Sequence, residues 1–346
     1  MKDIKIRPFI SGEERVVASI HNAAFEEWIE FLGKEYNYRY IKPEDVSAWV
    51  KENHVHKESL WIAEVDGKAV GYAHCRLELI RGKRDFNELL FVHTDRDMGQ
   101  SKIAVIPPYR RLGVAKTLIQ KIVEHFEDLG ADLAVVVTYS DNNAAEELLR
   151  RLGFVHKDFF YYKPYSETKP WRYDTVYVEL NLSEPIKPVR LNLDVNVRPA
   201  GEEDAEDIAE IFRKSAPWSP FGPKASLEQA LSYLKSSDYK IILVAEYKGK
   251  VVGVMDFNGN NYRLGIPGVL PEYRKKGIGY TLFYHLLENI RQKGFPKAIA
   301  DTGLILSDAI RMYSRFGFKV VRRQHHWIKI LHNNPSSDVS SQTCKR

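Results

Sequence analysis

The most informative stretch of this chain is Val105-Ile106-Pro107-Pro108-Tyr109-Arg110-Arg111-Leu112-Gly113-Val114-Ala115. It reads as the end of an apolar strand, a proline break, a pair of arginines and a glycine that opens a long amphipathic helix. The first turn of such a helix has N–H groups without intrahelical partners and the positive end of the helix dipole. Glycine lets the backbone approach a ligand closely. The stretch therefore predicts an anion site, and a diphosphate is the natural ligand.

Other phosphate motifs do not fit this stretch. A dinucleotide fingerprint needs three spaced glycines, and an NTPase loop needs Gly-Lys-Ser/Thr after its spacer. Neither pattern occurs between Val105 and Ala115. A solvated arginine pair followed by a turn glycine remains the alternative interpretation for a single copy.

The second half of the chain repeats the first in the same order. The matching pairs are Ile6-Arg7-Pro8 with Val197-Arg198-Pro199, residues 62–71 with 244–253, Tyr109–Gly113 with Tyr273–Gly277, and Gly153-Phe154 with Gly317-Phe318. We therefore predict two copies of one domain, at residues 1–182 and 194–332. Pro185 and Pro188 mark a linker at 183–193, and the Ser- and Asn-rich residues 333–346 are expected to be a disordered tail.

Each copy alternates strands and helices. The expected order is a short strand, two helices, a hairpin that turns at Asp66-Gly67 or Lys248-Gly249, a further strand, a long helix, a buried strand, another helix and closing strands. The long helices are expected at residues 115–129 and 279–293. The fold class is therefore α/β (or α+β), with a mixed, mostly antiparallel twisted sheet flanked by helices in each copy.

Composition narrows the possible classes of function. The 346 residues are 44% hydrophobic and 28% charged, and no apolar run is as long as the ~18 residues of a membrane helix. The formal net charge of +5 is mild and spread along the chain, so it permits an anionic ligand without indicating nucleic acid. The two cysteines, Cys75 and Cys344, form neither a disulfide framework nor a zinc spacing. We expect a cytoplasmic protein without a metal.

The loop resembles the acyl-CoA loop of the GNAT acyltransferase superfamily. In that family a strand ending in Val-x-Pro is followed by Arg-x-x-Gly-x-Gly/Ala, which opens a long helix. Val105–Ala115 and Val269–Gly279 match this pattern, and residues 145–154 and 309–318 match the family's late helix. The resemblance covers about residues 3 to 180 and 194 to 330, and implies two tandem GNAT-like domains.

The resemblance also implies where an acyl-CoA would bind. Backbone amides of the loop would hold the diphosphate, the strand before it would bond the pantetheine arm, and an Asn at the start of the late helix would lie nearby. The implied residues are Ile103, Val105, Arg110, Arg111, Leu112, Gly113, Val114, Ala115, Lys116 and Asn142 in the first copy, and Val269, Arg274, Lys275, Lys276, Gly277, Ile278, Gly279 and Tyr280 in the second. The second copy departs from the pattern at Pro267, which lacks an N–H, and at Leu306, which replaces the Asn.

The two main candidates for catalysis both lie in the second copy. Many family members have a Tyr four residues before the Gly-Phe glycine that can protonate the leaving thiolate, and Tyr313 matches it where the first copy has Leu149. Asp301 follows an apolar strand pattern and could accept a proton or bind a cationic substrate. A core tyrosine and a turn or helix-cap aspartate are the alternatives. His74 and the aligned Asp256 are further candidates for the base, and a strand residue without such a role is the alternative for each.

Two other segments lie outside the motifs described so far. Residues 81–99 have no counterpart in the second copy and could line an acceptor pocket or pack between domains. The run Arg322-Arg323-Gln324-His325-His326 suggests a metal or nucleic-acid patch. On a strand these side chains alternate between faces, so a solvated edge is the preferred interpretation.

The resulting hypothesis is an acyl-CoA-dependent N-acyltransferase, most simply an N-acetyltransferase that uses acetyl-CoA. The acceptor would be a small-molecule or peptide amine, with no nucleic-acid or membrane partner, and the protein a monomer or homodimer. The second copy is favoured for chemistry, and the first for binding CoA or supporting the fold. The alternative is a catalytically degenerate acyl-CoA sensor or scaffold.

Overall fold

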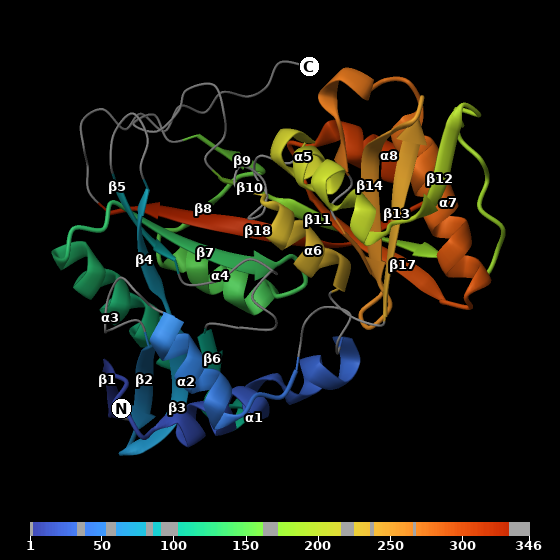
Figure 1. Cartoon of the computed structure of the whole chain (residues 1–346). Coiled ribbons are helices and arrows are strands. Elements are labelled where there is room, and N and C mark those ends of the chain that lie inside the picture. Colours follow the sequence, from blue (N-terminus) through green and yellow to red (C-terminus); the bar gives the residue numbers. More distant parts are fainter. Residues whose placement is uncertain are drawn as a thin grey trace. The chain divides into compact units, whose positions relative to one another are not determined.

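The computed structural model describes residues 3–32, 39–52, 60–80, 86–90, 103–161, 172–215, 225–235, 239–265 and 268–331. Contacts divide the chain into two compact units (Figure 1). Unit 1 holds Met1–Thr175, Gly303–Ile305 and Arg322–Arg346, and unit 2 holds Val176–Thr302 and Leu306–Val321. The closing strand of each repeat thus contributes to the unit built mainly from the other repeat. The boundaries at 182 and 194 stay a prediction about the repeats.

Unit 1 contains two main sheets. The first is antiparallel, in the order β1-β2-β3-β6 (Ile4–Pro8, Leu60–Val65, Lys68–His74 and Ile103–Val105). The second has the order β18-β7-β5-β4 (Lys319–Ile330, Leu133–Tyr139, Phe86–Leu90 and Arg76–Ile80), with β5 and β7 parallel. Short strands β8 (Val155–His156), β9 (Phe159–Phe160) and β10 (Arg172–Tyr173) complete the unit.

Helices cover both faces of the first sheet of unit 1. Strand β2 alternates, so that Trp61, Ala63 and Val65 face the core beneath α3 (Val114–Asp128), while Leu60 and Ile62 face α1 (Glu14–Leu32) and α2 (Pro43–Glu52). The periodic Leu118, Ile119 and Ile122 of α3 are buried in the first of these cores. The same core continues to α4 (Asn143–Arg151) and to Trp327 of β18.

Unit 2 repeats this plan with its own elements. Its sheet runs β12-β13-β14-β15-β17-β11 (Val195–Pro199, Lys240–Tyr247, Lys250–Asn258, Arg263–Leu264, Lys297–Gly303 and Thr175–Asn181), and β16 (Gly268–Val269) pairs with β14. Helix α7 (Ile278–Gln292) packs on β13 and β14, and α5 (Ala205–Ser215) packs on β14 and β16. Helices α6 (Leu227–Lys235) and α8 (Ser307–Arg315) complete the unit. Both units are therefore mixed α/β structures with mostly antiparallel sheets, which confirms the predicted fold class.

The repeated Ile/Val-Arg-Pro motif has a structural explanation. Arg7 pairs with Glu13 at 2.6 Å and with Glu64 at 2.7 Å, and Arg198 pairs with Asp204 at 2.7 Å. Each arginine thereby ties the first strand of its repeat to the start of the first helix, and Arg7 also reaches β2. The arginine recurs because both copies need this tie.

Several predicted segments lie outside the described residues. These are Pro267, the tail 333–346, and most of the excursion 81–99, of which only the backbone of β5 is described, as a strand beside β7. None of the described helices combines the length and the apolarity that crossing a bilayer demands.

Candidate functional site: two helix-opening loops

The predicted phosphate loops have nearly the same backbone in both units. After the short 3-10 turns Pro107–Tyr109 and Pro271–Tyr273, a left-handed residue (Arg111 or Lys275, φ 63° in each) is followed by a left-handed glycine. Gly113 has φ 89° and Gly277 has φ 80°, a region that favours glycine. Helices α3 and α7 begin at the next residue, and no side chain caps either of them. Each loop therefore presents a helix N-terminus that an anion could cap.

The strand before each loop is an edge strand of the kind the resemblance requires. The Ile106 N–H donates to the Val70 carbonyl at 3.0 Å, so residues 104 and 106 face β3. Because strand backbone groups alternate, those of Ile103 and Val105 face away from β3, toward the side where the sheet β1-β2-β3-β6 ends. In unit 2 the Leu270 N–H donates to the Val252 carbonyl at 3.0 Å, which leaves Val269 facing outward in the same way.

The first arginine of each loop is engaged by backbone carbonyls. Arg110 Nε donates to the Val105 carbonyl at 3.1 Å, and its Nη2 donates to the Ala24 carbonyl at 2.7 Å. Arg274 bonds the carbonyls of Val269 and Ser215 in the same way, at 3.1 and 3.3 Å. These guanidinium groups tie the strand, the loop and the first helix together. The other cations of the loops, Arg111, Lys116, Lys275 and Lys276, are exposed and are not used in these contacts.

The other predicted loop residues divide into core and surface. Val114 and Ile278 are buried beneath their helices, so only their backbone could face a ligand. Leu112 is exposed, Ala115 is half-buried, and a Cβ at Gly279 would lie 3.7 Å from Val269 Cγ2. The Tyr280 hydroxyl accepts a hydrogen bond from Arg315 at 3.1 Å, and its ring stacks on Phe316.

The two loops differ in what covers the glycine. Gly113 is exposed, and a Cβ added there would have no atom within 4 Å. At Gly277 the same Cβ would lie 3.0 Å from the Arg190 carbonyl oxygen and 3.3 Å from Asn192 Cβ. Asn192 also donates to the Lys276 carbonyl at 2.8 Å through its side chain, and to Thr281 Oγ1 at 2.8 Å through its backbone. The linker between the repeats therefore packs on the second loop, whereas the glycine of the first loop is open.

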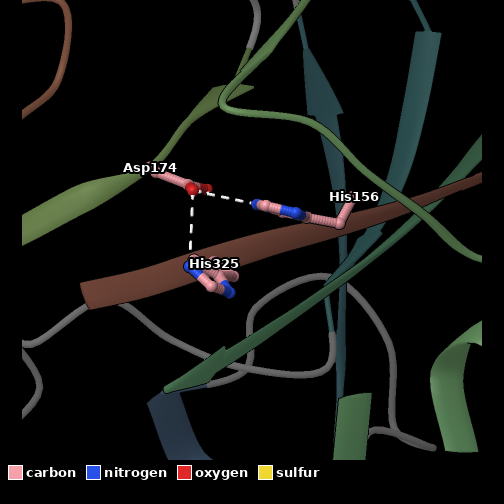
Figure 2. Close-up of side chains that lie close together, drawn as sticks. All are labelled: His156, Asp174 and His325. Atoms are coloured by element: carbon pink, nitrogen blue, oxygen red, sulfur yellow. Dashed lines mark hydrogen bonds and ion pairs between the residues drawn. The ribbon is translucent and has the colours of Figure 1, made fainter. Parts of the chain in front are cut away.

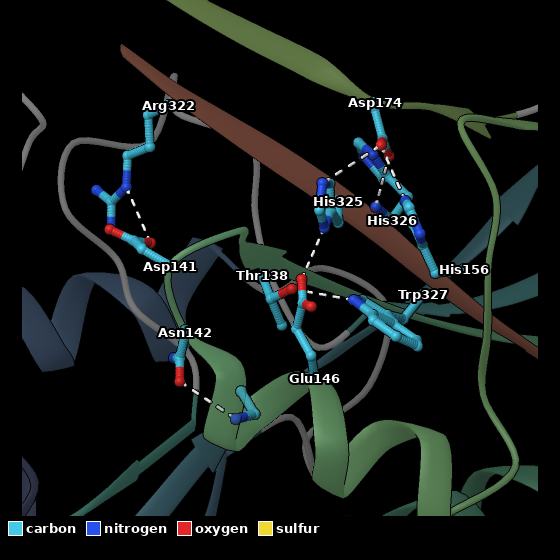
Figure 3. Close-up of polar contacts among 11 residues, drawn as sticks. Thr138, Asp141, Asn142, Glu146, His156, Asp174, Arg322, His325, His326 and Trp327 are labelled. Carbon is cyan, nitrogen blue, oxygen red and sulfur yellow. Dashed lines mark hydrogen bonds and ion pairs between the residues drawn. The ribbon is translucent and has the colours of Figure 1, made fainter.

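The late helices also differ at their first residue. Asn142 is the N-cap of α4, and its side chain accepts from the Ala145 N–H at 3.2 Å (Figure 3). Leu306 is the N-cap of α8 and makes no capping hydrogen bond with its side chain. The sequence difference at this position is thus a difference in helix capping.

The structure brings Tyr313 and Asp301 into one electrostatic neighbourhood in unit 2. Asp301 lies within β17 and forms an ion pair with Arg263 of β15, so it is neither a turn residue nor a helix cap. Tyr313 is 4% exposed and packs against Phe283 and Phe318. Burial, together with the charge of Asp301, raises the pKa of the Tyr313 hydroxyl. Both residues have packing or pairing partners that would explain them without catalysis.

A buried polar group in unit 2 surrounds Asp256. Its carboxylate accepts from the Tyr233 hydroxyl at 2.6 Å and lies 3.7 Å from Lys240 Nζ. Burial raises the pKa of Asp256 and lowers that of Lys240, against the attraction between their charges. The aligned His74 in unit 1 is also buried and stacks on Trp49. Both residues are therefore packed strand side chains.

The run from Arg322 to His326 is not a solvated edge, and that prediction is wrong. Residues 324–330 of β18 pair with β7, and Arg322, Gln324 and His326 are buried. Arg322 bonds Asp141 at 3.0 Å and lies over the Tyr139 ring (Figure 3 shows the Asp141 contact). The alternation of faces was predicted correctly. The partner strand β7 belongs to the other repeat, and periodicity carries no information about it.

Sequence reasoning missed a cluster around Asp174 in unit 1. Figure 2 shows His156 and His325 directed at its carboxylate, with His156 Nε2 2.9 Å and His325 Nε2 3.8 Å from Asp174 Oδ2. Burial opposes a charge on His156, but the hydrogen bond to Asp174 and the charges of Asp174, Asp158 and Glu146 outweigh it and raise its pKa. Burial lowers the pKa of His326 to about 3. The three residues lie far apart in the sequence, so no spacing signal could have found them.

Comparison with known proteins gives a family and a fold. The Acetyltransferase (GNAT) family matches residues 18–154 and 205–318, more than half of the chain and once in each repeat. Among solved structures, a GCN5-related N-acetyltransferase from Sphaerobacter thermophilus is 16% identical, with 95% of this chain and 96% of that chain covered and a TM-score of 0.55. A tandem GNAT protein from the clavulanic acid biosynthesis pathway, solved without AcCoA, is 14% identical, with 96% and 100% covered and a TM-score of 0.58.

A third solved structure, a GCN5-related N-acetyltransferase from Anabaena variabilis, is 12% identical, with 95% of this chain and 73% of that chain covered and a TM-score of 0.53. At these identities the structures establish the fold alone. The family match, by contrast, falls on the loops described above, with their left-handed glycines and outward-facing strands. The chain belongs to the acetyltransferase (GNAT) family, as a tandem member with one GNAT domain in each repeat.

Proposed function

We propose that this protein transfers an acyl group, acetyl in the simplest case, from an acyl-CoA to an amine, and that the coenzyme binds at the loop of unit 1. The observation that carries the proposal is the open Gly113 before the uncapped start of α3, beside the outward-facing backbone of Ile103 and Val105. A diphosphate fits the helix N-terminus, and an extended amide arm fits the outward-facing strand edge, where the Val105 carbonyl also accepts from Arg110.

Each part of the coenzyme has a complementary group in unit 1. The N–H groups of residues 113–116 would receive the diphosphate, with Arg111 and Lys116 adding positive charge. The backbone of Ile103 and Val105 would bond the pantetheine arm, near Asn142. An N–H of this strand edge would polarise the thioester carbonyl as a neutral amine attacks it. The thiolate then leaves, and the proton of the amine passes to a carboxylate or to water.

The first loop is favoured over the second because of the linker. Arg190 and Asn192 lie against Gly277, whereas Gly113 is open. Tyr313 and Asp301 stay the sequence-based prediction for chemistry in unit 2, which the ion pair with Arg263 and the burial of Tyr313 do not favour. Acceptor class, acetyl specificity, cytoplasmic location and oligomeric state also stay predictions.

A matched pair of charge reversals in the full chain tests the coenzyme site. Arg111 and Lys275 are exposed, have the same φ of 63° and occupy the same place in the two loops. We expect Arg111→Glu to weaken acetyl-CoA binding by about tenfold or more, which corresponds to about 1.4 kcal/mol. Lys275→Glu should leave the affinity within about twofold. Calorimetry with acetyl-CoA measures both.

The opposite ranking would move the coenzyme to unit 2, and a wild-type chain that binds no acetyl-CoA would refute the proposal. Turnover is tested separately, by release of the CoA thiol with a panel of primary amines. Tyr313→Phe should keep its turnover if the chemistry lies in unit 1, and loss of turnover with unchanged CoA affinity would place the acid in unit 2.

An acyl-CoA-binding sensor is the second candidate function. It is favoured by one observation: the position of the family's acid is a buried leucine, Leu149, in the repeat with the open loop, and a buried tyrosine in the other. Tight acetyl-CoA binding without thiol release across the amine panel would identify this case.

A further inference from the structure

Three potential metal ligands converge in unit 1, and none of them belongs to the helix-opening loops. They come from β8 (His156), the residue between β10 and β11 (Asp174) and β18 (His325). One ligand atom of each residue lies within 4.8 Å of the other two. Ligand atoms bound ~2.0–2.1 Å from a tetrahedral zinc ion lie about 3.3 Å from one another. The distances from Asp174 Oδ2, 2.9 Å to His156 and 3.8 Å to His325, bracket that value.

Asp174 is fixed in place by the chain around it. Its side chain is fully buried, and Oδ1 accepts the backbone N–H of His326 at 3.1 Å (Figure 3). The Asp174 backbone is held as well, because its N–H donates to the Asp158 carbonyl and its carbonyl accepts from Leu304. With Oδ1 occupied, Oδ2 is the oxygen that faces the two histidines. A buried carboxylate needs a cationic or hydrogen-bonding partner there.

Glu146 sets the orientation of the His325 ring. Its Oε1 lies 2.7 Å from His325 Nδ1, so it favours a proton on that nitrogen (Figure 3). In the neutral ring the Nε2 lone pair then faces Asp174 Oδ2 across 3.8 Å, a distance too long for a hydrogen bond. In that tautomer, a cation placed between Nε2 and Oδ2 would satisfy both acceptors. A carboxylate on the far nitrogen of a metal-ligating histidine is also the usual supporting contact in zinc sites.

The two imidazole rings lie against each other. Their centroids are 4.3 Å apart with an interplanar angle of 29°. The stack brings the two side chains to the same side of Asp174, so that both rings can contribute a nitrogen to one ion. The histidine side chains are 24% and 16% exposed, so an ion could enter from solvent.

We propose that His156, Asp174 and His325 bind a zinc ion in unit 1. Two imidazoles and one carboxylate form a donor set that suits zinc, and a fourth position would remain for water. His156 and Asp174 belong to the first repeat and His325 to the second. The ion would therefore fasten β18 to the strands of the first repeat. This proposal does not depend on the acyltransferase proposal.

Zinc titration of the untagged, chelator-treated full chain tests the site. In competition with a chromophoric chelator, we expect the wild type to bind one high-affinity equivalent. His156→Ala and His325→Ala should each weaken that equivalent by about a hundredfold or more, since each removes one of three ligands. His285→Ala is the matched control, because it removes a histidine from α7 of unit 2 and should bind zinc as the wild type does.

Glu146→Gln tests whether Glu146 only orients His325 and does not itself bind the ion. This variant should still bind one zinc ion, but with an affinity about 10–100-fold lower, which is the usual effect of losing a contact that supports a metal ligand. Zinc should also raise the melting temperature of the wild type and not that of His325→Ala, because only a chain with the site gains stability from the ion. The proposal fails if the folded wild type binds no zinc. It also fails if His156→Ala and His325→Ala both still bind one zinc ion as tightly as the wild type. In either case the cluster is a hydrogen-bonded network alone.

Discussion

Asp204 and Glu13 occupy the same place in the two repeats but differ in burial. The Asp204 side chain is 4% exposed and bonds both Arg198 and the Gly201 N–H, whereas that of Glu13 is 23% exposed. Burial alone would raise the pKa of Asp204, but the hydrogen bonds from Arg198 and Gly201 outweigh it and lower the pKa. We expect Asp204→Asn to lower the free energy of unfolding by about 1–3 kcal/mol at pH 7.

The loss in free energy of unfolding caused by Asp204→Asn should depend on pH in a definite direction. A carboxyl whose pKa is lower in the folded state stabilises the fold above its unfolded pKa of ~3.9, and this contribution disappears as the pH falls through the folded pKa. The gap between wild type and Asp204→Asn, measured by urea denaturation, should therefore narrow below about pH 4. Glu13→Gln should lower the free energy of unfolding at pH 7 by less than Asp204→Asn does. An equal or larger loss would contradict the role of burial.

Some residue roles could be predicted from the sequence and others could not. The glycines at 113 and 277 were predicted, because their place before a helical pattern requires a particular backbone. Arg110 and Arg274 were expected to lie at the phosphates, because the sequence shows only that they are positively charged and precede a helix. Their bonds to the Ala24 and Ser215 carbonyls depend on where the first helix of each unit packs, which is a tertiary feature.

Gly71 and Gly253 determine how closely the strand before each loop can approach its neighbour. A Cβ at Gly71 would lie 2.8 Å from the Ala104 carbonyl oxygen in β6, and a Cβ at Gly253 would lie 3.2 Å from that of Gly268 in β16. Because the nearest atom in each case is backbone, the strand itself must move. We expect Gly71→Ala to destabilise unit 1 by about 1–3 kcal/mol and to weaken acetyl-CoA binding.

Gly253→Ala in unit 2 is the matched control for Gly71→Ala. Its smaller overlap should cost less stability, and it should leave acetyl-CoA affinity unchanged if the coenzyme binds in unit 1. Chemical denaturation and calorimetry on both variants give the comparison. Equal losses of affinity in the two variants would contradict a coenzyme site in unit 1 alone.

Elements with strong local patterns were predicted closely. The long helices, expected at 115–129 and 279–293, begin and end one residue earlier, at Val114–Asp128 and Ile278–Gln292. Their apolar period and the preceding glycine carry that information. Strand β18 was recognised as a strand but taken for an edge, because its pairing with β7 joins residues nearly two hundred positions apart, a long-range contact that no local period records.

For the whole molecule, the exchanged strand predicts where a mutation acts. Trp327 belongs to the second repeat, yet it is 3% exposed in the core of unit 1, and its Nε1 donates to Thr138 at 3.0 Å. Trp327→Ala should lower stability by about 3–5 kcal/mol. Hydrogen exchange should accelerate in β7 and α3 of unit 1.

Phe318, nine positions earlier in the same repeat, is the matched comparison. It packs against Phe283 and Tyr313 in unit 2, so Phe318→Ala should accelerate exchange in α7 and α8. Faster exchange confined to unit 2 in Trp327→Ala would contradict the assignment of β18 to unit 1.

The strand exchange also bears on how a single repeat could exist. Strand β11 lies in unit 2 and most of β18 lies in unit 1, so each repeat gives its closing strand to the other and receives one in return. Between two separate chains, such an exchange is a domain-swapped dimer. The peptide segment at 183–193 makes the swap intramolecular, so that assembly does not depend on protein concentration. Neither half of the polypeptide contains all the strands that its own sheet needs.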